Sequence, residues 1–141
     1  MKKSPRILFM GSPDFAAISL RALAQKFNVV GVLTQPDRRA GRGKKLVSPP
    51  VKILADELDI PVIQPYRIKD DIAMDELRRF APDLIVVAAY GQILRPELLA
   101  LPRYGCVNVH GSLLPRWRGA APIQAAILAG DDEAGITIML M

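Results

Sequence analysis

Leu84-Ile-Val-Val-Ala-Ala89 is the stretch that decides the fold, because it is a run of apolar residues with no polar break. Near-continuous apolarity of this length, with β-branched residues, is typical of a strand that is buried on both faces. Such strands occur in parallel sheets whose two faces are covered by helices. The stretch therefore predicts an interior strand of a layered α/β domain.

Similar apolar runs recur on either side of this strand, and helix-like stretches separate them. The other expected strands are residues 6–10, 29–34, 61–63, 106–110 and 136–141. Helices are expected from residue 13 to 27 and over residues 50–58, 72–80 and 121–129. Alternation of this kind predicts the α/β class, with a mostly parallel sheet and helices on both faces.

The turn at Gly11-Ser-Pro-Asp14 predicts the start of the first helix. Gly11 permits a tight turn, Ser12 can cap the helix, and Pro13 suits the first helical position. The side chains expected to face the sheet recur at helical spacing. They are Phe15, Ile18, Ala22, Leu23 and Phe27.

Length and composition fit a single domain, because 141 residues with 50% hydrophobic content can form a core. One cysteine excludes an internal disulfide and fits a reducing compartment, and with one histidine it makes a zinc site a poor expectation. The N-terminal apolar run is too short for a signal peptide, and no window would span a membrane. We expect a cytoplasmic protein without a metal.

The positive charge of the chain is concentrated in one segment. Lys and Arg total 19 against 14 Asp and Glu, and residues 38–45 hold five of the cations and no acid. The rest is balanced, at 14 against 14. Residues 38–50 show no clear periodicity, so we expect an exposed, mobile loop that binds a partner.

The rarest residues gather in CVNVHGSLLPRWRG, residues 106–119, which holds the only cysteine, histidine and tryptophan. In a strand, the period of two places Asn108 and His110 on the face of Cys106, opposite Val107 and Val109. Open α/β sheets bind ligands at the carboxyl ends of their strands. An uncharged amide donor beside an imidazole suits a reaction that passes through a tetrahedral oxyanion.

Structural roles are the alternative for these residues. Taken alone, an asparagine two residues before a histidine more often caps a turn, beside a histidine whose hydrogen bonds are satisfied. Cys106 is not expected to act as a nucleophile, because the lone histidine is better placed beside Asn108. Residues 111–115 could cover a flat heterocycle with apolar side chains, or form a buried turn.

Asn108-Val-His-Gly-Ser-Leu-Leu-Pro115, followed by Arg-Gly-Ala-Ala-Pro at 118–122, resembles the active-site segment of the folate-dependent formyltransferases. Four further motifs are similar to the branch of this family that acts on methionyl-tRNA, and together they span the chain in register. These motifs are residues 11–15, 34–38, 41–45 and 117–124.

The resemblance implies a Rossmann-like catalytic domain over residues 1–141, followed in the family by a β-barrel domain. It implies transfer of a formyl group from 10-formyltetrahydrofolate to the α-amine of initiator methionyl-tRNA, without a metal or nicotinamide and with no protein partner evident. The residues that it assigns fall in three groups. Asn108 and His110 are catalytic; Ser112, Leu113, Leu114 and Pro115 contact the folate; Arg42, Lys44 and Lys45 contact the tRNA.

The apolar run 136–141 continues to the last residue without a turn, so we expect a truncated domain. In the family an aspartate that completes the site follows a segment resembling residues 135–141. We therefore expect little or no formyl transfer from this polypeptide alone.

Three other interpretations stay open or are disfavoured. Related branches that act on sugar nucleotides or glycinamide ribonucleotide, or that hydrolyse formyltetrahydrofolate, share the pattern at 108–115. A non-catalytic RNA-binding module could use residues 38–45 for phosphates and Trp117 for stacking. A dinucleotide-binding domain is disfavoured, because residues 11–16 lack the three-glycine fingerprint.

Overall fold

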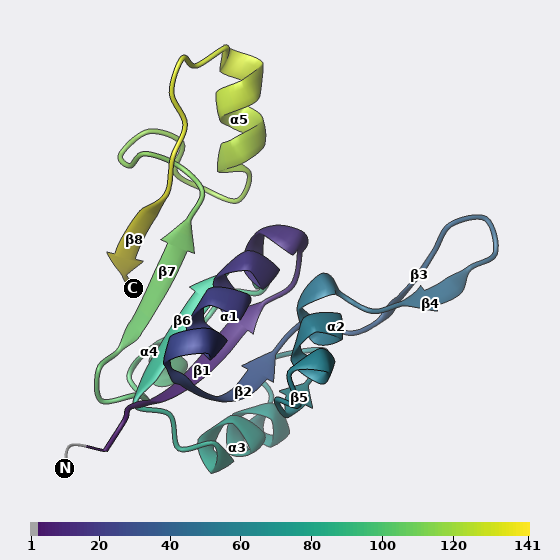
Figure 1. Ribbon diagram of the computed structural model, residues 1–141, viewed down its shortest axis with the longest axis vertical. Helices are drawn as coiled ribbons and strands as arrows, with labels where there is room; N and C mark the ends of the chain where they lie inside the picture. The colour runs from purple at the N-terminus through teal and green to yellow at the C-terminus, as the bar shows by residue number, and fades with distance from the viewer. Residues whose placement is uncertain (1–2) are drawn as a thin grey trace.

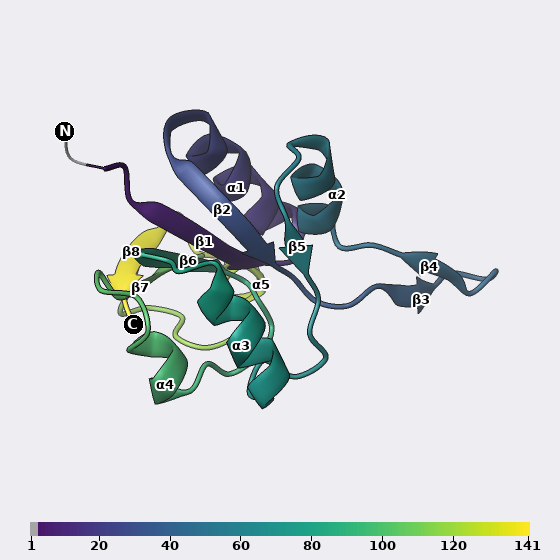
Figure 2. The ribbon, with the colours of Figure 1, turned by 90° about the horizontal axis from the view of Figure 1, so that it is seen from below.

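The computed structural model describes residues 3–141, which form a six-stranded sheet with helices on both faces (Figures 1 and 2). The strand order is β5-β2-β1-β6-β7-β8, and the first five strands are parallel while β8 runs antiparallel to β7. This confirms the α/β class with a mostly parallel sheet. The bounds are β1 Arg6–Gly11, β2 Asn28–Leu33, β5 Val62–Ile63, β6 Leu84–Ala88, β7 Cys106–His110 and β8 Thr137–Leu140.

The helices are divided between the two faces of the sheet. Helices α1 (Asp14–Lys26) and α2 (Pro50–Glu57) cover one face, and α3 (Asp71–Arg79) and the short α4 (Pro96–Leu99) cover the other (Figure 2). Helix α5 (Pro122–Ala129) lies beyond the carboxyl end of β7 (Figure 1). Helix α4 has one turn and was not predicted. None of the helices in residues 3–141 is long and apolar enough to cross a membrane.

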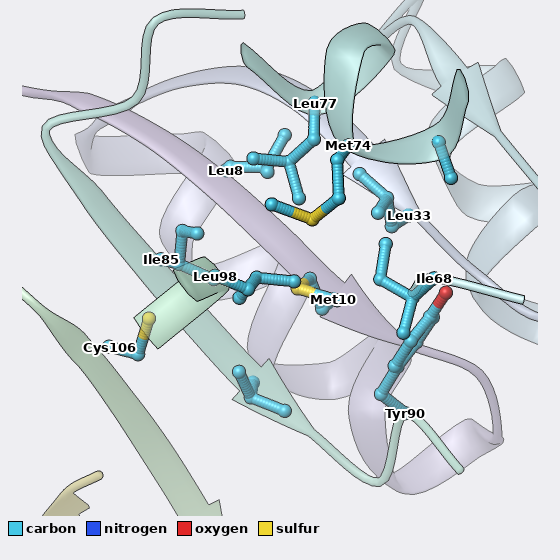
Figure 3. Close-up of a cluster of buried hydrophobic side chains, with 12 residues drawn as sticks. Leu8, Met10, Leu33, Ile68, Met74, Leu77, Ile85, Tyr90, Leu98 and Cys106 are labelled. Atoms are coloured by element: carbon cyan, nitrogen blue, oxygen red, sulfur yellow. The ribbon is translucent and has the colours of Figure 1, made fainter. Parts of the chain in front are cut away.

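Two apolar clusters, one on each face, follow from the alternation along the strands. On β1, Leu8 and Met10 enter the cluster under α3 and α4 (Figure 3), whereas Ile7 and Phe9 enter the cluster under α1 and α2. Strand β6 does the same with Ile85 and Val86. Both faces of these central strands are therefore buried, which explains the unbroken apolar runs.

The predicted face of α1 is partly wrong. Ala16 and Leu20 are the buried residues of the helix, whereas Ile18 is 73% exposed. Phe15 and Leu23 do pack against the cluster on this face, so the stripe that faces the sheet is rotated relative to the predicted one. The cap is also different, because the helix begins at Asp14 with Pro13 as its N-cap. The Ser12 hydroxyl donates instead to the Tyr90 carbonyl at 3.3 Å.

Residues 38–47 form a hairpin rather than the expected irregular loop. Strands β3 (Arg38–Ala40) and β4 (Lys45–Val47) pair antiparallel and project away from the sheet (Figure 2). At the tip, Gly41 has φ 73° and Lys44 has φ 47°, and the Lys44 N–H donates to the Gly41 carbonyl at 3.2 Å. The strands are short and every residue in them is exposed, so they leave no alternating pattern in the sequence.

Candidate functional site

The predicted catalytic residues lie on the last parallel strand, where the sheet opens into a cleft. As expected, Cys106 packs in one apolar cluster while Val107 and Val109 pack against the other. Asn108 and His110, which are half-buried, therefore share the face of Cys106. Residues two apart on a strand are about 7 Å apart, so both side chains can reach one small ligand.

The cleft exists because β6 ends before β7 does. Asn108 pairs with Val87, which is the last register pair between the two strands. Two residues later the chain turns away at Ala89, with φ 49°, and Gly91, with φ 92°. Beyond that point β7 is paired only with β8, where His110 lies opposite Thr137. The freed edge borders a cleft of about 710 Å³ that Asn108 and His110 both line.

The cleft lies at the carboxyl ends of the parallel strands, as the sequence predicts. Pro13 and Phe15 line it after β1, and Ala89 to Leu94 line it after β6. Strands β2 and β6 lie on opposite sides of β1, so the chain reverses its direction of winding beside this cleft. In open α/β sheets that reversal marks the place where ligands bind.

His110 has one ring nitrogen fixed by the loop that follows it. Its Nε2 lies 2.9 Å from the Trp117 carbonyl oxygen. Since a carbonyl only accepts, Nε2 carries the proton in this contact, and in the neutral ring Nδ1 is then the acceptor. The loop thereby selects one tautomer of the only histidine.

The loop residues predicted to contact folate divide into two pairs. Leu114 and Pro115 border a second cleft of about 590 Å³ together with Asn108 and His110. Ser112 is only 3% exposed and its hydroxyl donates to the Arg116 carbonyl at 2.6 Å, which closes the loop on itself.

Leu113 turns away from these clefts. It packs against Gly135, where a β-carbon would lie 2.5 Å from a Leu113 methyl group. The structure thus brings Leu114 and Pro115 beside Asn108 and His110, whereas Ser112 is buried within the loop and Leu113 lies against Gly135. Folate binding by these four residues stays a prediction.

The three cations predicted to bind tRNA lie apart from Asn108 and His110. Arg42 and Lys44 are at the tip of the hairpin and Lys45 begins β4, and all three are exposed. The base of the hairpin, through Arg38, Ala40 and Val47, lines a third cavity of about 520 Å³.

This cavity adjoins the main cleft, because Pro13, Ala89, Tyr90 and Gly91 line both. Just before β3, Asp37 fixes the base of the hairpin. Its carboxylate accepts from Gln64 Nε2 at 2.7 Å and lies 3.4 Å from Lys52 Nζ. The Gln64 hydrogen bond, with help from Lys52, lowers the pKa of Asp37.

A family model described as formyl transferase matches residues 5–141, which is nearly the whole chain. The chain belongs to the formyl transferase family. Similar curated proteins are named methionyl-tRNA formyltransferase. The protein of Desulfotalea psychrophila is 59% identical over 99% of this chain, and that of Geobacter sulfurreducens is 56% identical over 96%. This chain spans 44% and 43% of their lengths.

Solved structures of formyltransferases share the fold. Phosphoribosylglycinamide formyltransferase from Streptococcus pneumoniae TIGR4 superposes with a TM-score of 0.73 at 25% identity, covering 99% of this chain and 74% of that one. A formyltetrahydrofolate deformylase from Pseudomonas syringae gives 0.68 at 25% identity, over 99% and 46% of the two chains. The family resemblance read from residues 108–122 is therefore confirmed.

One residue that anchors the loop beside His110 was not predicted from the sequence. Asp131, just after α5, accepts from Arg116 Nε at 2.9 Å, from Arg116 Nη2 at 2.6 Å and from the Trp117 indole N–H. The Arg116 and Trp117 hydrogen bonds lower the pKa of Asp131 to about 2. In the sequence it is one of three consecutive acids after Gly130, and nothing there distinguishes it from its neighbours.

No group of three or more His, Cys, Asp or Glu side chains is arranged to hold a metal ion within residues 3–141. The polar groups that line the clefts of this chain include the amide of Asn108 and the imidazole of His110. These suit stabilisation of an oxyanion and transfer of a proton.

Proposed function

We propose that this chain forms the catalytic part of an enzyme that transfers a formyl group from 10-formyltetrahydrofolate to the α-amine of initiator methionyl-tRNA. The observation that carries the proposal is the placement of Asn108 and His110 on one strand face, at the opening between β6 and β7. Its substrate assignment is supported by the curated relatives, which are named methionyl-tRNA formyltransferase.

The reaction exchanges one carbon–nitrogen bond for another. The amine attacks the formyl carbon, a bond to the amine nitrogen forms, and the bond to the folate nitrogen breaks. Asn108 donates from its amide to the oxyanion that develops on the formyl oxygen. The attacking amine loses a proton and the leaving nitrogen gains one, and His110 is the side chain beside Asn108 that can carry it.

Beyond oxyanion stabilisation and proton transfer, much of the rate enhancement in such a reaction comes from positioning the two substrates, because neither needs to form a covalent intermediate with the protein. The apolar walls from Leu114, Pro115 and Ile93 suit a flat pterin ring, whose edge can bond to the backbone of the loops after β6 and β7. Asn108 lines both the main and the second cleft, so a folate bound against these walls would have its formyl group beside Asn108.

The hairpin is proposed to hold the tRNA. Arg42, Lys44 and Lys45 are exposed at its end and can bind phosphates, while its base borders the cavity that adjoins the cleft. An acceptor strand lying along the hairpin would bring its aminoacyl end to the catalytic pair. We place this reaction in the cytoplasm, where a free thiol such as Cys106 stays reduced.

A chimaera tests the function, in which this chain replaces the matching N-terminal part of the Desulfotalea psychrophila relative. Formylation of methionyl-tRNA by the chimaera is expected, with Asn108→Ala lowering kcat about 10²- to 10³-fold, the usual cost of losing an oxyanion donor. Asn28→Ala, at the only other asparagine, is the matched control. The chain alone is assayed beside them.

A substrate panel gives the contrary outcomes. Transfer to a sugar nucleotide or to glycinamide ribonucleotide, with none to methionyl-tRNA, would overturn the substrate assignment. If a folded Asn108→Ala variant has an unchanged kcat, Asn108 does not stabilise an oxyanion and the proposed mechanism is wrong. Binding of tRNA without any folate binding would favour an RNA-binding module instead.

A further inference from the structure

We propose that Asp131 is a positioning residue for His110, acting through the carbonyl of Trp117. The inference rests on the proposed function, because it concerns the imidazole that would move the proton. Asp131 does not line the clefts that Asn108 and His110 border. Its effect would pass along three consecutive contacts, from the end of α5 to the ring of His110.

The first contact fixes Asp131 itself. Helix α5 ends at Ala129 and is capped by Gly130, which adopts the left-handed conformation with φ 68°. The Asp131 N–H then donates to the Ala126 carbonyl at 3.1 Å. This is the 6→1 bond of a helix-terminating glycine motif. The carboxylate is 13% exposed, so its position is set by the helix end and by the loop packed on it.

The second contact joins Asp131 to two consecutive loop residues. Both carboxylate oxygens bind Arg116, in the paired geometry that suits a guanidinium, and one of them also accepts from the Trp117 indole. The Arg116 guanidinium lies 4.4 Å from the centre of the Trp117 ring. One acid thus holds both side chains on the same side of the loop.

The third contact passes from Trp117 to the histidine. Trp117 has φ 58°, a conformation that a bulky residue rarely adopts unless its surroundings hold it. In that conformation its carbonyl accepts from His110 Nε2 at 2.9 Å, and the Ser112 hydroxyl lies 3.4 Å from the same oxygen. The hydrogen bond from the Trp117 indole to Asp131 therefore holds the Trp117 carbonyl oxygen against the His110 ring.

The consequence is a preference for one tautomer of His110. With Nε2–H held by the carbonyl, Nδ1 is the nitrogen that exchanges the proton of the reaction. If Asp131 loses its charge, or Trp117 its N–H, the loop can leave the left-handed conformation. The ring would then populate both tautomers and fewer molecules would present the reactive one.

The single histidine makes the test direct, because ¹⁵N NMR of the 141-residue chain reports one imidazole. At a pH where the ring is neutral, the wild type is expected to show mainly the Nε2–H form. Asp131→Asn and Trp117→Phe are expected to shift the signals toward a mixture of tautomers. Asp132→Asn, the same change at the adjacent exposed acid, is expected to leave them unchanged.

Kinetics of the chimaera supply a second readout. Both variants are expected to lower kcat about 10-fold while KM for the folate changes little, by analogy with the loss found when a partner that orients a metal-bound histidine is removed. The NMR result does not depend on any activity. If the two variants shift the tautomer but the chimaera transfers no formyl group, this inference stands and the proposed function is wrong.

The inference is overturned if folded Asp131→Asn and Trp117→Phe both keep the Nε2–H form. Should Asp131→Asn fail to fold, Trp117→Phe decides alone, because it removes only the indole N–H and keeps the pair between Arg116 and Asp131. Loss of the tautomer preference in Asp132→Asn would also overturn it, since that carboxylate has no part in the contacts described.

Discussion

At the residue scale, Asp131 is an acid whose side-chain hydrogen-bond partners all lie in one loop. Arg116 and Trp117 bind its charged form, and they hold its pKa at about 2, below the value of 3.8 for a free side chain. The charged carboxylate is therefore favoured more in the folded chain than in the unfolded one. Its stabilising effect is full above the unfolded pKa and is lost as the pH falls toward 2.

Thermal unfolding across pH measures this effect. Asp131→Asn is expected to lower Tm by a constant amount above about pH 5, and the difference from the wild type should shrink between about pH 4 and 2. Asp132→Asn is the control and should follow the wild type throughout. A difference that stays constant down to pH 2 would show that the Asp131 charge contributes nothing.

Cys106 gives a second prediction at this scale. Burial in the cluster under α3 and α4 raises the pKa of its thiol to about 11. Because the thiolate is the reactive form, the thiol should be inert toward a disulfide reagent at pH 8 while the chain is folded. Absorbance with Ellman's reagent should show one thiol reacting only after denaturant is added, whereas fast reaction of the native chain would contradict this.

Single residues differed in how far the sequence could place them. The shared face of Asn108 and His110 followed from the period of a strand, which is a local property. The contact of His110 with Trp117 could not be predicted, because it depends on a left-handed residue and on packing of residues 112–119 against the end of α5. Asp131 could not be predicted for the same reason, because its contacts with Arg116 and Trp117 depend on this packing.

At the element scale, the hairpin β3–β4 has no apolar face to bury. Its stability comes from the ladder between β3 and β4 and from the turn at Gly41 to Lys44, where Arg39 Nη1 also donates to the Lys44 carbonyl at 3.0 Å. An element of this kind produces no hydrophobic pattern, so the sequence predicted only its charge and exposure. The strands of the sheet were predictable because burial left apolar runs.

The charge of the hairpin can be tested through salt dependence. Replacing Arg42, Lys44 and Lys45 by Ala in the chimaera should weaken tRNA binding and flatten the slope of log K against log salt by about 2, since each phosphate contact contributes about 0.7 to 0.9. Folate binding, measured by fluorescence quenching, should be unchanged.

A second triple variant, Lys26→Ala, Lys69→Ala and Arg79→Ala, removes the same charge from exposed positions near α1 and α3. It is expected to retain the slope of the wild type. If both triple variants flatten the slope equally, the hairpin has no special part in binding and net charge alone explains the affinity.

At the scale of the whole molecule, one sheet joins two apolar clusters. Leu20 on α1 and Leu77 on α3 are both fully buried, on opposite faces. Leu20→Ala and Leu77→Ala should each lower the free energy of unfolding by about 2 to 5 kcal/mol. Ile18→Ala, at the exposed position on α1, should cost less than about 0.5 kcal/mol.

Urea unfolding followed by circular dichroism and by Trp117 fluorescence checks this, and the two signals should coincide in each variant. Coincidence is expected because β1 and β6 contribute side chains to both clusters, so neither face can unfold while the other persists. Two separated transitions would contradict the shared core. A large loss of stability in Ile18→Ala would instead support the buried face of α1 that helical spacing predicts.

The hairpin contributes no side chain to either apolar cluster in the described part of the chain. Its length, charge and tip can therefore change during evolution, or by grafting, with little penalty to folding. Asn108, His110 and the cleft stay where the sheet holds them. Under the proposed role of the hairpin, a replaceable arm beside a fixed reaction centre would let substrate choice diversify while the chemistry is inherited.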